Sequence, residues 1–582
     1  MLVVLLLLLL PSVPVLVRRG LGAFLPLGLV AVAFWGLLVW IWMPNLASPY
    51  GWLGYAWALV FGGIIGLGGT LRGSVGPVAR ILPDPWTVRV AASAAGLGLL
   101  TVVVTLIGPG WLFPLTSIRQ VAASGQIHVS TSALPPINVA QLNVVPPATA
   151  YQAMANAVGS YGAQYQVSPN QVYEVRIGGQ QVYVAPLIWN TWFVWLQTGG
   201  RSPGYIEISA TNPNAAPTFV AKSFRYEITG VPLYSGSNVR RHIWSAGYRR
   251  WVLSTSWDSF EIAPNGTPYW VVSGAVPTDG MAGLRITAVL LLNAETGAIT
   301  RLPLGTAIPS WINEAVPPQV ATDWTQWYGR YRNGWFAASP WGSHIGIYQP
   351  VYLSNGAATF GVMGPGGDLY WYTGLTSNAN ADNSLVGYVM VDARTGASTF
   401  YPEGPGMMNG AAAIQKVDGT FPNNQLVGAM PLFADLYGKE VFVVPVVNGS
   451  NKLQDFAIVD PRAPNAPALT AGSWTDALGA LQQYLASGLA GTSGASSSVQ
   501  EITVSGQIGR IGMESPGTIA FTITGHSLVF SASAASFPTA ALAQAGDSVT
   551  VTYVLTPGTT QPVIPVSSFS DPTILGSNAS SA

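Results

Sequence analysis

The chain has 582 residues, of which only 8 % are charged, and its 24 basic and 24 acidic side chains cancel. The length indicates three or more structural units, and the balanced charge argues against nucleic acid as a main partner. Cysteine is absent, which excludes disulfides, thiolate metal sites and cysteine nucleophiles.

The first 115 residues are predicted to be a transmembrane anchor of three or four helices. Three runs in this part carry no charge and reach the roughly 20 apolar residues that a bilayer requires; they are 21–43, 51–71 and about 90–115. Residues 1–17 are predicted to be either a further span or a leader. Two prolines interrupt this run, which weakens a span, and it has no basic residues at its start, which weakens a secretory signal.

The arginines predict the orientation of these spans. Arg18 and Arg19 precede the run 21–43, whereas the loop 44–50 carries no charge. Three further arginines lie between the second and third runs. Because basic loops stay in the cytoplasm, the sequence predicts a multi-pass protein of the cell membrane, with the lipid bilayer as a partner and the residues after about 116 outside the cytoplasm.

Residues 116–489 have the pattern of a β-rich region with internal repeats. After a small-residue helix at 149–162, four units follow, each with a hairpin, a third strand that ends in a polar residue, and a tight turn. The hairpin turns are at Gly178-Gly179, Asn265-Gly266, Gly366-Gly367 and Tyr437-Gly438. The polar residues that end the third strands are Ser209, Asn293, Asp392 and Asp460. Such side chains bond to backbone amides of their own turn, and Gly297 and Gly396 allow a positive φ.

The phrases "NAETGAI" (293–299) and "VDARTGAS" (391–398), each after a hairpin and an aliphatic strand, resemble the PepSY module of bacterial envelope proteins. More broadly, "FEIAPNGTPYWVV" and "DLYWYTGLTS" are similar to phrases of an uncharacterised family of membrane-anchored bacterial proteins. The resemblance implies PepSY-like repeats that bind or inhibit outside the cytoplasm rather than catalyse. The long apolar leader and the scarcity of charge depart from that module.

The C-terminal part is predicted to hold a helix at 473–489, a linker at 490–498 and a small OB-like β-barrel at 499–565. Residues 566–582 are predicted to be a disordered tail. The expected fold class is therefore α+β, with N-terminal transmembrane helices, antiparallel PepSY-like repeats and a small terminal barrel.

Two aromatic stretches are the candidate binding sites. The first, "RRHIWSAGYRRW" (240–251), has arginines that can grip an anionic polymer or lipid headgroups, or that are instead solvated or paired with Glu227 and Asp258. The second, within 323–342, suits a carbohydrate or peptide groove, or simply a core rich in large side chains. The candidate residues are Arg240, Arg241, His242, Arg249, Arg250, Trp327, Tyr331 and Trp335.

No residue pattern identifies a reaction or a cofactor. The four histidines do not stand at metal-ligand spacing, and the carboxylates available for a glycosidase-like pair are Glu261, Asp279, Asp323, Asp368 and Asp382. The predicted function is non-enzymatic binding, inhibition or scaffolding at the cell envelope, on an envelope polymer or another envelope protein. The rival is an envelope hydrolase acting on peptidoglycan or polysaccharide, which requires a concave site where two titratable groups converge.

Overall fold

The computed structural model describes scattered residues between 33 and 43 and between 89 and 103, and then 113–486 and 500–574 with short internal gaps. Within these ranges, no helix is both long and apolar enough to cross a membrane. The N-terminal transmembrane helices of the expected fold class are thus not found there. Most of 21–43 and 90–115, and all of 51–71 and 1–17, lie outside the described residues.

The prediction of a multi-pass protein of the cell membrane depended on those spans. It is therefore not supported by the described part of the structure. A charge-free run shows that a segment avoids water, but crossing a bilayer also needs one continuous helix of about 20 residues. Composition alone therefore does not establish a span. Of the predicted run 90–115, the last residues belong to helix α5 (Phe113–Ala122), which continues past that run and packs against helix α9 (Pro318–Tyr331).

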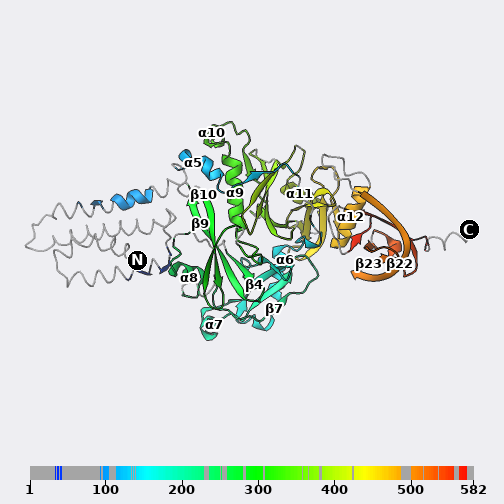
Figure 1. Cartoon of the computed structure of the whole chain (residues 1–582), viewed down its shortest axis with the longest axis horizontal. Coiled ribbons are helices and arrows are strands. Elements are labelled where there is room, and N and C mark those ends of the chain that lie inside the picture. Colours follow the sequence, from blue (N-terminus) through cyan, green and yellow to red (C-terminus); the bar gives the residue numbers. More distant parts are fainter. Residues whose placement is uncertain are drawn as a thin grey trace, which may run out of the picture.

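Four antiparallel sheets make up the centre of the molecule (Figure 1). The first sheet has its strands in the order β3-β4-β6-β7, and these are β3 (Tyr173–Ile177), β4 (Gln180–Pro186), β6 (Tyr205–Ser209) and β7 (Thr218–Val220). The second sheet likewise follows chain order, with β8 (Asp258–Ile262), β9 (Pro268–Thr278), β10 (Gly283–Asn293) and β11 (Ile299–Pro303). A separate short pair joins β2 (Tyr165–Gln166) to β5 (Ile188–Trp189).

The third and fourth sheets have the same up-and-down order of strands, except that two short strands take the place of the first strand. In the third sheet β12 and β13 both pair with β14, and its strands are β12 (Tyr348–Pro350), β13 (Thr359–Met363), β14 (Leu369–Ser377), β15 (Gly387–Asp392) and β16 (Ser398–Pro402). A short strand β1 (His128–Val129) adds to β16 in parallel. In the fourth sheet β17 and β18 both pair with β19, and its strands are β17 (Val427–Gly428), β18 (Leu432–Leu436), β19 (Lys439–Val447), β20 (Leu453–Val459) and β21 (Leu469–Ala471).

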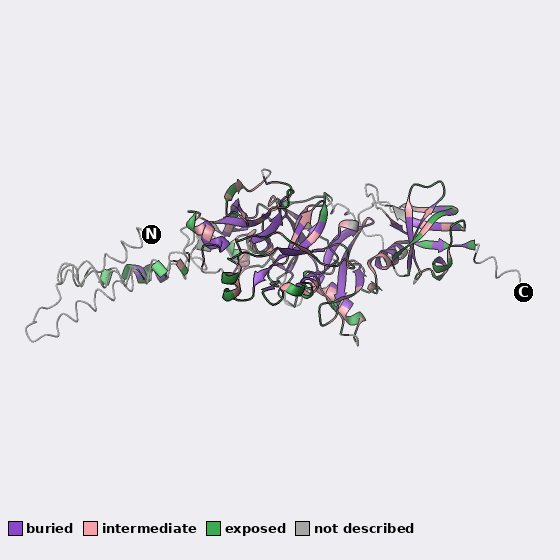
Figure 2. Cartoon of the chain, turned by 90° about the horizontal axis from the view of Figure 1, so that it is seen from below, coloured by how far each residue is buried: buried purple, intermediate pink, exposed green. Residues whose placement is uncertain are grey.

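Neighbouring sheets share buried cores in chain order, and the buried residues run through the strands of the central body (purple in Figure 2). Val175 of the first sheet lies in one cluster with Trp270 of the second, and Ile286 of the second lies with Val389 of the third. A third cluster joins the third and fourth sheets, as at Tyr388 and Phe433. Four-stranded meanders that pack around a common centre are arranged like the blades of a β-propeller.

The predicted hairpins and turns are present. Gly266, Gly367 and Gly438 all have positive φ in tight connections between paired strands. Asn293 Oδ1 accepts hydrogen bonds from the amides of residues 295 and 296, at 3.0 and 2.9 Å. Asp392 Oδ1 accepts in the same way from residues 394 and 395, both at 2.9 Å. The polar residue at the end of each third strand thus caps its own turn, as its sequence position predicts.

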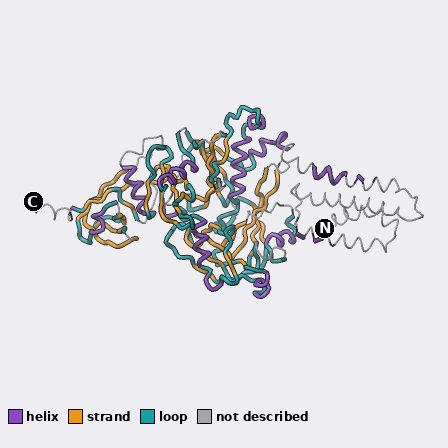
Figure 3. The backbone as a smooth tube through the Cα atoms, turned by 180° about the vertical axis from the view of Figure 1, so that it is seen from behind, coloured by secondary structure: helices purple, strands orange, loops and turns teal. Residues whose placement is uncertain are grey.

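Short helices connect and cover the sheets (Figure 3). Besides α5 and α9 they are α6 (Pro147–Asn156), α7 (Trp192–Gln197), α8 (Val239–Ser245), α10 (Trp335–Ala338), α11 (Gly410–Thr420) and α12 (Trp474–Ala486). Helix α6 is the predicted small-residue helix, and it buries Ala150 and Met154 against the first sheet. Helix α12 packs on β20 and β21 and leads toward the C-terminal barrel.

The C-terminal strands form a six-stranded sheet in the order β26-β24-β23-β22-β25-β27. Its members are β22 (Gln500–Ser515), β23 (Thr518–Ile523), β24 (Val529–Ser533), β25 (Ser548–Leu555), β26 (Ile564–Pro565) and β27 (Ser568–Ser570). The last two strands are two residues apart in sequence yet pair with opposite ends of the sheet, so the sheet curls on itself. The barrel therefore continues past the predicted boundary at 565, and the first residues of the predicted disordered tail form one of its strands.

Candidate functional site

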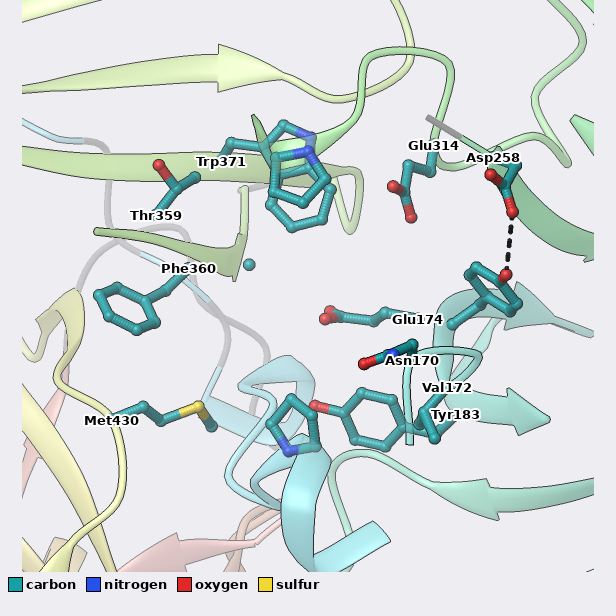
Figure 4. Close-up of a pocket in the computed structure, with 14 residues that line it drawn as sticks. Asn170, Val172, Glu174, Tyr183, Asp258, Glu314, Thr359, Phe360, Trp371 and Met430 are labelled. Carbon is teal, nitrogen blue, oxygen red and sulfur yellow. Dashed lines mark hydrogen bonds between the residues drawn. The ribbon is translucent and has the colours of Figure 1, made fainter. Parts of the chain in front are cut away.

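A cavity of about 290 Å³ lies where the four sheets meet (Figure 4). The first strands of the sheets contribute to its wall: Glu174 comes from β3, Asp258 from β8 and Phe360 from β13, and Met430 precedes β18. The full lining is Pro147, Asn170, Val172, Tyr173, Glu174, Tyr183, Asp258, Glu314, Pro318, Thr359, Phe360, Gly361, Trp371 and Met430. Strands of the first three sheets and the segment before β18 of the fourth sheet therefore surround one shared site.

Glu174 enters this cavity because β3 alternates its side chains. Tyr173 and Val175 are buried in the core with the second sheet, whereas Glu174 between them is half-buried and points to the cavity (Figure 4). Asn143 Nδ2 donates to Glu174 Oε1. Burial raises the pKa of Glu174 to about 8, so at neutral pH this side chain favours its protonated form.

Gly361 of β13 lets the Glu174 carboxyl group approach. A Cβ atom at this position would lie 2.7 Å from Glu174 Oε2, which is inside van der Waals contact. A side chain here would push the carboxyl group out of its place, so the glycine is part of the site even though it carries no functional group.

Asp258 forms the only cavity-lining ion pair that the described residues show. Arg240 Nη2 lies 2.5 Å from Asp258 Oδ1, and the Tyr173 hydroxyl donates to Asp258 Oδ2 over 3.1 Å. Burial raises the pKa of Asp258, and the guanidinium of Arg240 counteracts this shift. The two donors therefore stabilise the carboxylate form of Asp258 against the effect of burial.

Glu314 is positioned in the cavity through Glu261, a buried residue of β8. Glu261 accepts hydrogen bonds from the backbone amides of Asn313 and Glu314, at 3.1 and 3.0 Å, and from Asn313 Nδ2 at 3.1 Å. These bonds fix the loop that carries Glu314. Burial raises the pKa of Glu314 well above its ordinary value, and the negative charges of Glu261, Asp258 and Glu174 add to the shift.

The lining combines carboxyl groups with aromatic faces. Among the lining residues that the structure describes, three are acidic and none is basic, while Trp371 and Phe360 supply aromatic surface on the opposite side (Figure 4). The indole Nε1 of Trp371 donates to the carbonyl oxygen of Val316 over 2.6 Å, which fixes the ring.

In the part of the chain that the structure describes, no cluster of three or more His, Cys, Asp or Glu residues could hold a metal ion.

The predicted basic patch at 240–251 does not form an exposed binding surface for an anionic polymer or lipid headgroups. Arg240 and Arg241 lie on α8 and are buried, at 6 % and 1 % exposure. Arg240 pairs with Asp258, which is one of the two partners considered from the sequence, and Arg241 donates to the carbonyl oxygen of Trp40 and stacks on its ring. His242 Nε2 lies 2.9 Å from the carbonyl oxygen of Gly297.

The remaining predicted residues lie elsewhere. Arg249 stacks on Trp244 of its own segment, and Arg250 is outside the described residues. Trp327 and Tyr331 are half-buried on α9, and Trp335 on α10 is 39 % exposed. None of the seven predicted binding residues that the structure describes lines the central cavity.

The carboxylates considered from the sequence also have other roles. Glu261 anchors the 313–314 loop, Asp323 is on α9, and Asp368 pairs with Arg394 in a hairpin turn. Asp279 and Asp382 lie outside the described residues. Glu174 and Glu314 were not singled out, because each is a lone acid in an unremarkable segment and only the packing of the sheets brings them together.

Comparisons with known proteins give no assignment. No family model matches the chain, and no curated protein matches it. Among solved structures, a point mutant of the Synechocystis apocarotenoid oxygenase is 12 % identical with a TM-score of 0.17, and the cobalt-substituted Synechocystis ACO is 13 % identical with a TM-score of 0.16. Each alignment covers 53 % of this chain and 61 % of the other, so the chain spans less than two thirds of those structures. Scores this low carry no argument, and the resemblance to PepSY modules stays a prediction.

Proposed function

We propose that the chain is a binding protein whose central cavity takes a small organic cation, such as an alkylammonium or arylalkylammonium ion. The observation that carries the proposal is the charge of the lining: Glu174, Asp258 and Glu314 face one cavity, and none of the described side chains that line it is basic. Arg240 balances Asp258 from outside the lining. The other two carboxyl groups have no basic partner among the ion pairs of the described residues.

The chemistry of the site fits a cation better than a neutral or anionic molecule. Without a ligand, burial raises the pKa values of Glu174 and Glu314, which favours their protonated forms. An ammonium ion would displace these protons, neutralise the negative charges of the carboxylates and donate hydrogen bonds to them. The faces of Trp371 and Phe360 would attract the same cation through their π-electrons, and a cavity of about 290 Å³ suits a small molecule.

Calorimetry with a matched pair of ligands tests this function. The titrations are carried out above pH 8, because the pKa of Glu174 is about 8. Under these conditions benzylammonium is expected to bind, whereas the isosteric benzyl alcohol is not. The double variant Glu174→Gln, Glu314→Gln is expected to weaken binding at least tenfold, or by about 1.4 kcal/mol. Glu207→Gln is the control, because Glu207 lies on β6 outside the lining. Equal binding of alcohol and ammonium, or no binding across alkyl- and arylammonium ions, would contradict the proposal.

The same cavity keeps an envelope hydrolase as a second candidate. Glu174 retains a proton at neutral pH, as a general acid in glycoside hydrolysis must, and a second carboxyl group stands in the same cavity. Incubation with peptidoglycan and with neutral polysaccharides, followed by assay of new reducing ends, separates the two functions. Turnover that Glu174→Gln abolishes and Glu207→Gln preserves would favour the hydrolase, whereas cation binding without turnover favours the binding protein.

A further inference from the structure

Four acidic side chains lie in or next to the central cavity, and the fold supplies them unequally with hydrogen-bond donors. Asp258 has its guanidinium partner and a tyrosine hydroxyl. Glu261, which lies outside the lining, accepts three hydrogen bonds from the 313–314 loop and a fourth from Ser259 Oγ over 3.2 Å. The protein itself therefore provides donors for these two carboxyl groups.

The other two, Glu174 and Glu314, have few donors. Within the described part of the chain, Glu174 accepts from Asn143 Nδ2 alone, and no group donates to the carboxyl oxygens of Glu314. Both side chains line the cavity. Figure 4 shows that they enter it from different walls, Glu174 from β3 and Glu314 from the loop that precedes α9. A carboxylate withdrawn from water needs donors or a counter-charge, so each of these two groups requires one from a ligand.

Asn143 supplies a further acceptor at the wall that carries Glu174. The side chain is 2 % exposed, and its Oδ1 has no hydrogen-bond partner among the described residues. Because Nδ2 of the same amide group donates to Glu174 Oε1, Oδ1 lies beside that carboxyl group. Buried acceptors are rarely left without a donor, and an ammonium group carries three N–H donors. An ammonium group at Glu174 therefore offers a donor for each of the two acceptors.

We propose that the ligand of the cavity is a diammonium ion, with one ammonium group at Glu174 and the other at Glu314. This inference rests on the proposed function and makes it more specific. A single ammonium group neutralises one of the two carboxylates and leaves the other without a partner, whereas two ammonium groups on one chain pair with both. The carbon chain between them would lie against the aromatic faces of Trp371 and Phe360, which line the same cavity.

Titration calorimetry with isosteric pairs of ligands, above pH 8, tests the inference. A series from propane-1,3-diammonium to octane-1,8-diammonium is compared with the alkylammonium ions in which a methyl group replaces one ammonium group. Butane-1,4-diammonium, for example, is paired with pentylammonium. The series is needed because the spacing of the nitrogen atoms must match the separation of the two carboxyl groups. The best-fitting diammonium ion is expected to bind at least roughly tenfold more tightly than its isostere.

Glu314→Gln is the informative variant, because it keeps the size of the side chain but cannot ionise. It is expected to lower the affinity for the diammonium ion roughly tenfold more than the affinity for the isostere, so that the preference between the two ligands is lost. Glu207→Gln, on β6 outside the lining, is the control and should keep the preference of the wild type.

The outcomes separate this inference from the proposed function. If benzylammonium binds but no diammonium ion is preferred over its isostere, the diammonium ligand is excluded and the cation site remains. A preference that persists in Glu314→Gln would also overturn the inference, because another group would then meet the second charge. Competitive displacement of benzylammonium by magnesium or calcium chloride would assign the two carboxyl groups to a metal ion instead. If no ammonium ion binds, the proposed function fails, and this inference fails with it.

Discussion

Arg240 and Asp258 form a buried ion pair in which Nη2 and Oδ1 lie 2.5 Å apart, although one residue lies in the first turn of helix α8 and the other begins strand β8. Both side chains are almost inaccessible, at 7 % and 3 % exposure. The pair fastens the helix to the innermost strand of the second sheet and at the same time sets the charge of one wall of the cavity. It therefore links the stability of the fold to the properties of the site.

Arg240→Met is expected to destabilise the protein by about 3–5 kcal/mol, because it leaves the buried carboxylate of Asp258 without its cation. Lys222→Met is the control: Lys222 pairs with Glu295 at 3.0 Å, but both side chains are about one third exposed, and such pairs contribute at most about 1 kcal/mol. Urea unfolding followed by tryptophan fluorescence measures both. Equal, small losses in the two variants would mean that the pair is not needed for folding.

Gly297 and Gly266 offer a matched comparison of turn glycines. Both have positive φ, at 79° and 75°, so alanine at either position costs about 1–2 kcal/mol in backbone strain. A Cβ at Gly297 would also overlap the ring of Tyr226, whereas nothing lies within 4 Å of one at Gly266. Gly297→Ala is therefore expected to lower the melting temperature clearly more than Gly266→Ala. The opposite order, or equal shifts, would show that Tyr226 moves aside at no cost.

These turns belong to the part of the fold that local sequence could predict. Asn293 and Asp392 bond to amides two and three residues ahead, so everything that specifies their turns lies within one short phrase. The hairpins are equally local, because glycine at a positive-φ position and alternating strands on both sides are visible in the sequence. Repetition of such phrases indicated repeated antiparallel units.

The site could not be predicted in the same way. Glu174, Asp258 and Glu314 are separated by more than fifty residues in each step, and they meet only because successive sheets pack around one centre. The cluster of arginines at α8 was misleading for a related reason. Basic residues in a row suggest a solvated surface, but Arg240 is buried against Asp258, which the sequence offered as one of two partners, and Arg241 is buried against Trp40 of a distant segment.

The raised pKa of Glu174 predicts how stability depends on pH. In the unfolded chain Glu174 titrates near its ordinary value of 4.5, and in the folded protein at about 8. Between these values the folded state keeps a proton that the unfolded state has lost, so this residue makes stability fall as pH rises through that window. Glu174→Gln keeps an acceptor for Asn143 but cannot ionise.

Melting temperatures of the wild type and Glu174→Gln are therefore expected to agree at low pH and to separate as the pH rises toward 8, with the variant the more stable. Glu295→Gln, at a turn outside the cavity, is the matched control and is expected to follow the wild type. Parallel melting curves for wild type and Glu174→Gln over the whole range would contradict the buried, protonated state of Glu174.

The same proton predicts the pH dependence of cation binding. An ammonium ion binds the carboxylate form of Glu174, so below a pH of about 8 it must first displace the proton. The affinity for benzylammonium is therefore expected to increase roughly tenfold for each pH unit below that value and to level off above it. Calorimetry in buffers of different ionisation enthalpy counts the released protons. Glu174→Gln should lose most of this slope as well as affinity, and an affinity that does not change with pH would exclude Glu174 as the group that meets the cation.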